Sequence, residues 1–421
     1  TARLVRALSK LVQSSYKSFA DFICDEKRSA LRSVDPSNFI THQGLRQYVT
    51  NLQLPVESSG GRKPVVSIAL PNGPLMAATC VAVTTYYTAA PINPAAGAEQ
   101  FRADVLQAKA KVILTSENDY HKLQLDASWV REEGIQVFIV EWNGGDDIVV
   151  RTTNGSPLPS SPAPEPNQPD DIALILFTSG TSGTKKVVPL TIHSLVAGII
   201  FVMDSWGLTV DDICLNMMPL YHVGGLVRNI FAPIFSRSST VCCTTFDPNM
   251  FWDVVESIQP TWYYASPSMH SVILAEAPAR STALKKSQIR LACNAAGGLL
   301  PSLACQLRDT FNCVVLPSYG MTECMPISTP PLDYKLDREG TSGISTGPGL
   351  TILDWSDEHV KDGTVGRICV RGEPTFHGYL KPDGSLDKSP FNRSGWFDTG
   401  DLGYMDKDGY LYITGRSKEV I

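Results

Sequence analysis

The sequence predicts an α/β protein of layered sheets with flanking helices, followed by a smaller β-rich subdomain. Short apolar, β-branched runs bounded by turn residues recur at 65–70, 111–115 and 136–140, as expected of strands buried on both faces. Helix-compatible segments separate these runs, which favours a parallel sheet with crossover helices. After residue 364 the strands become associated with Gly-rich turns, which is typical of β-rich structure.

The first elements are predicted from apolar spacing. Apolar residues at helical spacing within the first 12 residues predict a helix, and Ile40-Thr41 reads as a short strand that leads into another helix. The run at 65–70 is closed by Pro-Asn-Gly and followed by an Ala-, Val- and Thr-rich segment up to Ala90. This order indicates a strand, a turn and a helix.

A connection separates the first part of the chain from the next. Residues 152–171 are rich in Pro, Ser and Asn, so we expect an exposed linker there. A strand at 172–177, a Gly-, Ser- and Thr-rich loop and a helix at 193–206 follow. We therefore expect α/β subdomains at 1–171 and 172–345 and a β-rich subdomain at 346–421.

Composition narrows the class of protein. The chain has 421 residues, 43% of them hydrophobic and 19% charged, with a formal charge of -6, so it offers no basic stripe for nucleic acid. Its ten cysteines include no Cys-x-x-Cys pair, which argues against a zinc site or a disulfide framework and favours a cytoplasmic setting. No apolar run approaches the ~20 residues of a membrane span.

The first motif is a polar loop with the residues of a phosphate grip. It reads Thr178-Ser179-Gly180-Thr181-Ser182-Gly183-Thr184-Lys185-Lys186. Its glycines free the backbone, and its hydroxyl groups and lysines can surround phosphate oxygens. The spacing does not match a Walker-type P-loop, and taken alone the run is equally consistent with a flexible loop.

The second motif is Ser318-Tyr319-Gly320-Met321-Thr322-Glu323. It offers an aromatic face for a base, a hydroxyl for a phosphate and a carboxylate for a magnesium ion. As isolated residues they are also compatible with a turn that carries a core tyrosine.

Two further motifs complete the set. The third motif spans 396–401 and 409–418, where Asp401 can accept hydrogen bonds from both hydroxyls of a ribose and Arg416 supplies a cation. The alternatives are a β-turn role for Asp401 and a surface ion pair for Arg416. In the fourth, 220–225 and 295–298, glycines allow close approach of a ligand and His222 can gate a pocket. A lone histidine is more often structural.

These four motifs, in this order, resemble those of the adenylate-forming superfamily of acyl-CoA synthetases, peptide-synthetase adenylation domains and luciferases, and in particular a fungal synthetase-like adenylation domain. The resemblance runs from about Ile40 to the end. It implies ATP-dependent activation of a carboxylic acid as acyl-AMP, with release of pyrophosphate. The family usually has Pro and Gly beside the loop lysine, where this chain has Lys185 and Val187.

The resemblance also implies residue roles. It places Tyr319 on adenine, Thr322 at the α-phosphate, Glu323 at Mg²⁺, Asp401 on the ribose hydroxyls and Lys418 at a hinge, after which the small C-terminal domain is absent. The implied catalytic residues are Lys186, Thr322, Glu323 and Arg416. The implied nucleotide-binding residues are Thr178, Ser179, Gly180, Thr181, Ser182, Gly183, Gly297, Gly298, Tyr319, Gly320, Asp401 and Arg416. The implied substrate-binding residues are His222, Asn294, Ala296, Ser318 and Met321.

Substrate and acceptor are predicted more coarsely. Amino-acid-activating members carry an Asp near the position of His222, and this chain has Tyr221-His222-Val223, so we expect a small acid other than an ordinary α-amino acid. The expected acceptor is the phosphopantetheine thiol of a carrier protein, with a free-standing acyl-CoA ligase as the alternative. A non-catalytic nucleotide- or acyl-binding module is the alternative of another class. Luciferase-like oxygen chemistry would rest on analogy of fold alone.

Overall fold

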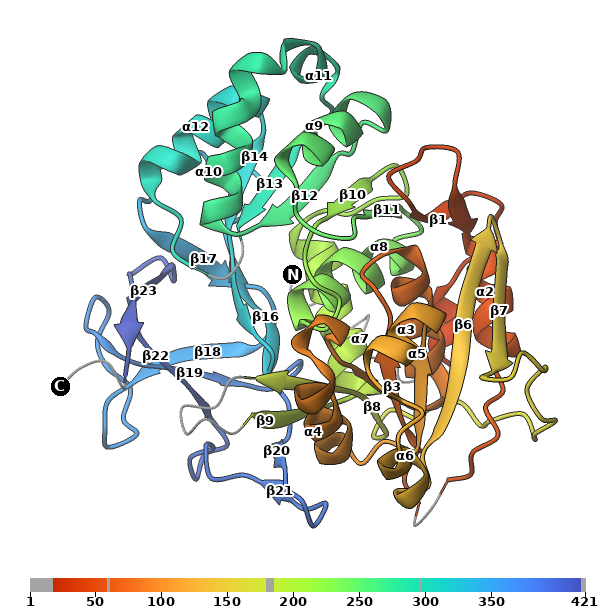
Figure 1. Cartoon of the computed structure of the whole chain (residues 1–421). Coiled ribbons are helices and arrows are strands. Elements are labelled where there is room, and N and C mark those ends of the chain that lie inside the picture. The colour runs from red at the N-terminus through yellow and green to blue at the C-terminus, as the bar shows by residue number, and fades with distance from the viewer. Residues whose placement is uncertain (1–17, 59–60, 179–184, 295–296, 418–421) are drawn as a thin grey trace.

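The computed structural model describes residues 18–58, 61–178, 185–294 and 297–417 (Figure 1). The helix expected in the first 12 residues lies outside these ranges. Two seven-stranded mixed sheets, a seven-stranded antiparallel sheet and a two-stranded hairpin form the framework. Within the described ranges, no helix is both long and apolar enough to cross a bilayer. The predicted α/β class with a β-rich part is confirmed.

The first sheet has the strand order β7-β6-β5-β3-β4-β8-β9. Its strands are β3 (Val65–Ala69), β4 (Thr88–Pro91), β5 (Val112–Thr115), β6 (Gln136–Gly144), β7 (Asp147–Thr152), β8 (Ile172–Thr178) and β9 (Lys186–Thr191). The helices that connect or flank them are α2 (His42–Asn51), α3 (Pro74–Tyr86), α4 (Ala98–Ala108), α5 (Glu117–Lys122) and α6 (Ser128–Glu132). Strands β3 to β6 pair in parallel, because helices connect their apolar runs. Helix α3 packs in the main core on one face of the sheet, and α4 packs in a separate cluster on the other face.

The second sheet has the order β14-β13-β12-β10-β11-β1-β2. Its strands are β1 (Ser29–Arg32), β2 (Phe39–Thr41), β10 (Ile213–Asn216), β11 (Ser239–Cys242), β12 (Trp262–Ala265), β13 (Leu291–Asn294) and β14 (Val314–Pro317). The helical segments around it are α7 (Ile192–Ser205), η3 (Gly224–Phe231), α8 (Ala232–Phe235), α9 (Pro248–Ser257), α10 (Pro267–Glu276), α11 (Ser281–Lys286) and α12 (Pro301–Phe311). Figure 1 shows α9 to α12 together on the outer side of this sheet. The buried residues of η3 pack with α7, so the two segments fill the opposite side.

The third sheet is antiparallel and follows the order β15-β16-β17-β23-β22-β19-β18. Its strands are β15 (Tyr319–Met321), β16 (Cys324–Thr329), β17 (Thr341–Ser345), β18 (Gly349–Leu353), β19 (Gly366–Arg371), β22 (Phe397–Met405) and β23 (Leu411–Arg416). The small hairpin is β20 (Tyr379–Leu380) and β21 (Leu386–Asp387). The short 3-10 turns are η1 (Phe19–Phe22), η2 (Pro94–Ala96) and η4 (Ala277–Ala279). Strand β20 packs next to β9, which brings the C-terminal part of the chain against the first sheet.

The sheets do not follow the expected subdomain boundaries strand by strand. Strands β8 and β9, expected in the second subdomain, extend the first sheet through β4. Strands β1 and β2, expected in the first subdomain, join the second sheet, where Leu31 of β1 pairs with Thr240 of β11. Neither pairing is visible in local sequence because both depend on contacts between distant segments. The division at 171 and 345 stays a prediction.

Candidate active site

A cavity of about 900 Å³ opens where the three sheets meet. Its wall is built from the ends of β8 and β9, the start of η3, β12, the β15–β16 turn, β20, β22 and β23. The predicted residues that line it are Thr178, Lys186, His222, Gly320, Met321, Thr322, Glu323 and Arg416. Residues up to 238 positions apart in sequence therefore meet at one cavity.

Some predicted residues lie elsewhere. Ser179, Gly180, Thr181, Ser182, Gly183, Ala296 and Lys418 are outside the described residues. Asn294 and Ser318 lie behind the wall, where Ser318 Oγ donates a hydrogen bond of 2.9 Å to the Asn294 carbonyl. Gly297 is fixed by Asn294, whose Nδ2 donates to the Gly297 carbonyl at 2.7 Å, and Gly298 is exposed beside it.

Glu323 is the buried carboxylate of the cavity. It is 5% exposed, and the Tyr379 hydroxyl donates to its Oε1 at 2.6 Å. Burial raises the pKa of Glu323, while the hydrogen bond from Tyr379 and the charge of Lys186 oppose that rise. The Lys186 ammonium also lies 4.3 Å from the centre of the Tyr379 ring. Tyr379 of β20 thus links the lysine and the carboxylate, and nothing in its local sequence distinguished it from other aromatic residues.

Adjacent Lys185 has a different environment. Its Nζ forms a 2.6 Å ion pair with Asp104 of α4, whose side chain is only 5% exposed. Gln107, one turn further along α4, donates to the Lys185 carbonyl at 2.8 Å. Lys185 therefore anchors the start of β9 to helix α4, and Lys186 is the lysine that faces the cavity.

Asp401 connects two of the predicted nucleotide-binding residues. The Tyr319 hydroxyl donates to Asp401 Oδ2 at 2.5 Å, and Arg416 Nε pairs with Asp401 Oδ1 at 2.9 Å. Asp401 on β22 is directly opposite Arg416 on β23, so strand register sets this ion pair. Burial, and then the neighbouring Asp401 carboxylate, raise the pKa of Tyr319. The expected contacts with adenine and ribose stay predictions.

The glycines of the fourth motif are required by close approach. A Cβ on Gly225 would lie 2.3 Å from the Pro219 carbonyl oxygen, and one on Gly224 would lie 2.9 Å from the Tyr264 ring. The Pro219 carbonyl and the Tyr264 ring cannot move without disturbing their own packing. Glycine at both positions therefore allows the chain to pack closely beside His222. Burial lowers the pKa of His222, so its imidazole is neutral at pH 7. It can line a pocket, but it supplies no charge.

Sequence reasoning missed Arg228 in η3. It is 1% exposed, and its Nη1 donates to Ser318 Oγ at 2.6 Å. Its guanidinium carbon lies 4.9 Å from the ring centres of both Trp206 and Tyr264. A charged residue inside the otherwise uncharged, largely apolar run 223–235 was the signal that could have identified it.

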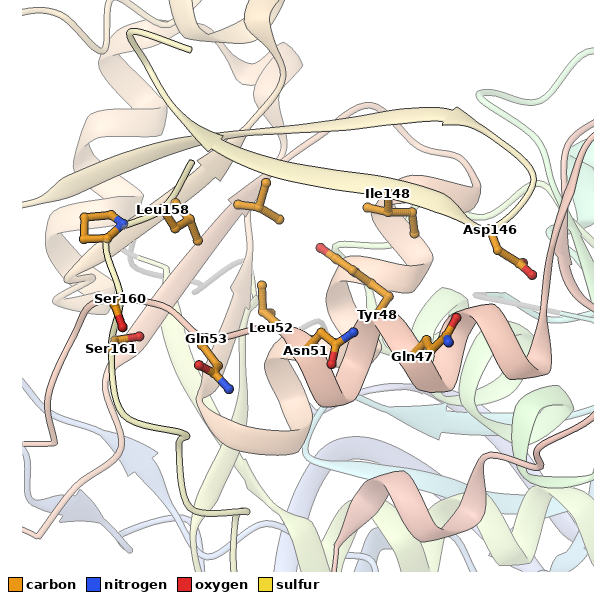
Figure 2. A pocket seen from close by; sticks show the side chains of 12 residues that line it. Gln47, Tyr48, Asn51, Leu52, Gln53, Asp146, Ile148, Leu158, Ser160 and Ser161 are labelled. Atoms are coloured by element: carbon orange, nitrogen blue, oxygen red, sulfur yellow. The ribbon is translucent and has the colours of Figure 1, made fainter. Parts of the chain in front are cut away.

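A second hollow lies away from these residues. Figure 2 shows it beneath β7, with Gln47, Tyr48 and Asn51 of α2 along one side and Ser160 and Ser161 at one end. Its Asp146 already accepts hydrogen bonds from the backbone and hydroxyl of Thr41. None of the predicted site residues lines this hollow, so the larger cavity is the candidate active site.

Comparison with known proteins agrees with this geometry. The sequence model of a family described as AMP-binding enzyme matches residues 26–380. The chain is 31% identical over 421 residues to the oxalate–CoA ligase of Arabidopsis thaliana, covering 98% of this chain and 80% of that protein. It is 31% identical over 402 residues to the sulfoacetate–CoA ligase of Cupriavidus necator, covering 93% and 75%.

Solved structures share the fold. ATP-bound MatB from Rhodopseudomonas palustris matches with a TM-score of 0.80 and 23% identity, covering 96% of this chain and 79% of that one. The luciferase-like enzyme of the mealworm Zophobas morio matches with a TM-score of 0.77 and 19% identity, covering 96% of both chains. At these identities the likeness concerns the arrangement of the sheets and helices.

Proposed function

Because this chain belongs to the family of AMP-binding enzymes and is a carboxylate-adenylating ligase, we propose that it converts a small carboxylic acid into its CoA thioester through an acyl-AMP. The observation that carries the proposal is the convergence of Lys186, Thr322, Glu323 and Arg416 on one cavity. Relatives named as CoA ligases support CoA as the acceptor. CoA therefore replaces the carrier-protein thiol, which was the acceptor expected from the sequence, as the preferred acceptor.

The proposed reaction has two steps. A carboxylate oxygen of the acid attacks the α-phosphorus of ATP, the bond from that phosphorus to the bridging oxygen breaks, and pyrophosphate leaves with the electron pair. The CoA sulfur, as its thiolate, then attacks the acyl carbonyl carbon, and AMP departs. An ionised carboxylate needs no general base, so the protein's task is to align it with the α-phosphorus and to neutralise charge.

The described residues suit that task. Lys186 and Arg416 supply positive charge at the cavity, and Thr322 supplies a hydroxyl for a phosphate oxygen. Neutral His222 lines the acid end and takes no proton in this scheme. Tyr319 and Asp401, joined by their hydrogen bond, are the proposed supports of the adenosine.

Glu323 fits a magnesium ion that enters with the nucleotide. No group of three or more His, Cys, Asp or Glu side chains suited to a metal occurs in the part of the chain that the structure describes. Mg²⁺ at nucleotide sites is typically held by one or two carboxylates together with substrate phosphates and water. Glu323 would supply that carboxylate, and the ion would neutralise phosphate charge. We keep Lys418 as the proposed hinge.

Pyrophosphate exchange into ATP tests the proposal. The full-length protein is assayed with a panel of carboxylic acids that includes α-amino acids, and products are then sought with CoA and with a phosphopantetheinylated carrier protein. Exchange with a non-amino acid, followed by a CoA thioester, is expected. Transfer only to the carrier protein would restore the first acceptor of the sequence analysis. ATP binding without exchange for any acid would favour the non-catalytic binding module.

A further inference from the structure

Arg228 is a buried cation that the protein does not neutralise. Its hydrogen-bond acceptors in the described chain are uncharged: Ser318 Oγ at 2.6 Å from Nη1, Met325 Sδ at 2.9 Å from Nε and the Tyr319 carbonyl at 3.5 Å from Nη2. Within residues 18–417, leaving aside the ranges not described, it has no carboxylate partner within 4.0 Å. Buried charges in proteins are normally paired, so this one stands out.

The guanidinium lies directly behind the cavity wall. It stacks on Tyr264, contacts Met325 and stands behind Gly320, and all three residues line the cavity. A methyl group placed on Gly320 would lie 3.2 Å from Arg228 Nη2. Glycine at this position therefore adds no side chain between the cation and the cavity beyond that of Met325, so the field of the charge reaches the space where the acid would lie.

Met325 occupies the place of a better acceptor. Its thioether sulfur is a weak acceptor at the end of a flexible side chain, yet it lies 2.9 Å from the Nε of a guanidinium. Such a side chain can change rotamer, whereas the rings of Trp206 and Tyr264, whose centres are 5.9 Å apart, pack beside each other against Arg228. Met325 therefore separates Arg228 from the cavity without fixing it there.

The distance to the reacting end suits a short acid. Gly320 lies in extended strand β15, two residues before Thr322. Two extended residues span about 7 Å. An acid whose carboxylate lies at the α-phosphate near Thr322 would therefore place a group only a few carbon atoms away beside Gly320, which is where Arg228 stands.

We propose that Arg228 recognises a second anionic group, carboxylate or sulfonate, at the end of a short acid remote from its reacting carboxylate. The inference rests on the proposed function and names its substrate class. Relatives named as ligases of oxalate, malonate and sulfoacetate act on acids with two anionic groups, which agrees with it. The anion would displace Met325 Sδ from the guanidinium and supply the missing negative charge.

Pairs of acids that differ in charge but hardly in shape test this proposal. Malonate and its monoamide, oxalate and oxamate, and succinate and succinamate are compared by pyrophosphate exchange in the full-length enzyme. Removing one partner of a buried charge pair costs about 100-fold in binding. We expect the wild-type kcat/KM to favour at least one diacid over its monoamide by about that factor. The Arg228→Met variant should lose the diacid rate about 100-fold and change the monoamide rate less than about fivefold.

Two results would overturn the assignment: equal wild-type use of diacid and monoamide, or an equal loss of both in Arg228→Met, which would identify a purely structural arginine. Arg228→Lys keeps the charge, so it should retain part of the diacid preference even where the Met variant fails to fold. Calorimetric binding of the same acids, with a non-hydrolysable ATP analogue present, separates the two proposals. Diacid binding that depends on Arg228 without exchange would sink the proposed function alone, and absence of that binding would sink the present one.

Discussion

Arg228 and Arg290 both contact Trp206, yet among the residues that the structure describes only Arg290 has a carboxylate partner. Arg290 donates from Nε and Nη2, each at 2.8 Å, to the two oxygens of Asp212, which is 3% exposed. Its remaining donors reach the carbonyls of Trp206 and Gly207. Arg228 has two aromatic faces and uncharged acceptors instead.

The two adjacent lysines repeat the contrast. Lys185 pairs with buried Asp104, and Lys186 faces Tyr379 and the cavity with no carboxylate within 4.0 Å in the described part of the chain. In both pairs the cation with its own carboxylate joins elements of the fold, and the cation without one lies at the cavity. The contrast teaches that an unneutralised cation here is better interpreted as a ligand contact than as a packing residue.

The lysine pair gives the largest expected difference. Lys186→Ala should lower the pyrophosphate-exchange rate about 1,000-fold, because it removes a preorganised positive charge from the proposed phosphate site in the cavity. The matched control Lys185→Ala should lower exchange less than about tenfold and mainly reduce the melting temperature, since buried Asp104 loses its partner. Equal losses of exchange in the two variants would contradict the different roles given to Lys185 and Lys186.

The arginine pair should separate by stability. Asp212→Ala should lower the free energy of unfolding by about 3 kcal/mol, measured by denaturant titration, because Arg290 and the Thr261 hydroxyl lose their acceptor. Asp211→Ala, next to it and exposed, should change that free energy by less than about 0.5 kcal/mol.

The same pair makes stability depend on pH. Burial raises the pKa of Asp212, but the hydrogen bonds from Arg290 and Thr261 outweigh burial and lower that pKa. The stabilisation is therefore present above the ordinary Asp range and is lost as pH falls through the lowered value. A stability of the wild type that does not depend on Asp212 would contradict this.

Glu323 extends the contrast to a buried carboxylate at the cavity. Burial raises its pKa in the folded state, so its contribution to stability is present below the ordinary Glu pKa and is lost as pH rises through the raised value. Glu323→Gln should escape that loss and melt about 1 to 3 °C higher than the wild type at pH 7.5. Exchange should fall about 100-fold, because the proposed magnesium ligand is lost. A lower melting temperature with unchanged exchange would show that the carboxylate is only structural.

The smallest effect is expected at a half-exposed pair. His193 Nε2 lies 2.8 Å from Glu373 Oε1, with side chains 27% and 36% exposed. The hydrogen bond that His193 donates to the Glu373 carboxylate raises the pKa of His193. This pair therefore stabilises the fold below the ordinary His pKa and stops doing so as pH rises through the raised one. Between pH 6 and pH 8.5 the wild type should lose up to about 0.5 kcal/mol more than Glu373→Gln. If the free energy of unfolding of the two proteins changed in parallel with pH, the pair would make no measurable contribution to stability.

Sequence patterns anticipated what is local. Helix α7 and strand β8 lie where the apolar runs predicted them, because the length and apolar pattern of each run select the element that buries its side chains. Lys186, Thr322, Glu323 and Arg416 were recognised from motifs, and only the fold brings them to one cavity. Tyr379 was missed because its contact with Glu323 joins a two-residue strand to a distant turn. Arg228 was missed although a charge in an apolar run signals burial.

The pairing of β1 with β11 has a consequence for synthesis. Leu31 leaves the ribosome before its partner Thr240, which follows roughly 200 residues later, an interval of about 10 to 40 s at common elongation rates. During that interval a nascent chain carries a strand with an open edge, whose Ala30 and Leu31 are buried only in the complete fold and which has no native neighbour on the β11 side. Premature pairing of that edge with another nascent chain would trap the second sheet before it forms. Protection of the β1 edge until β11 has been made would therefore limit such mispairing.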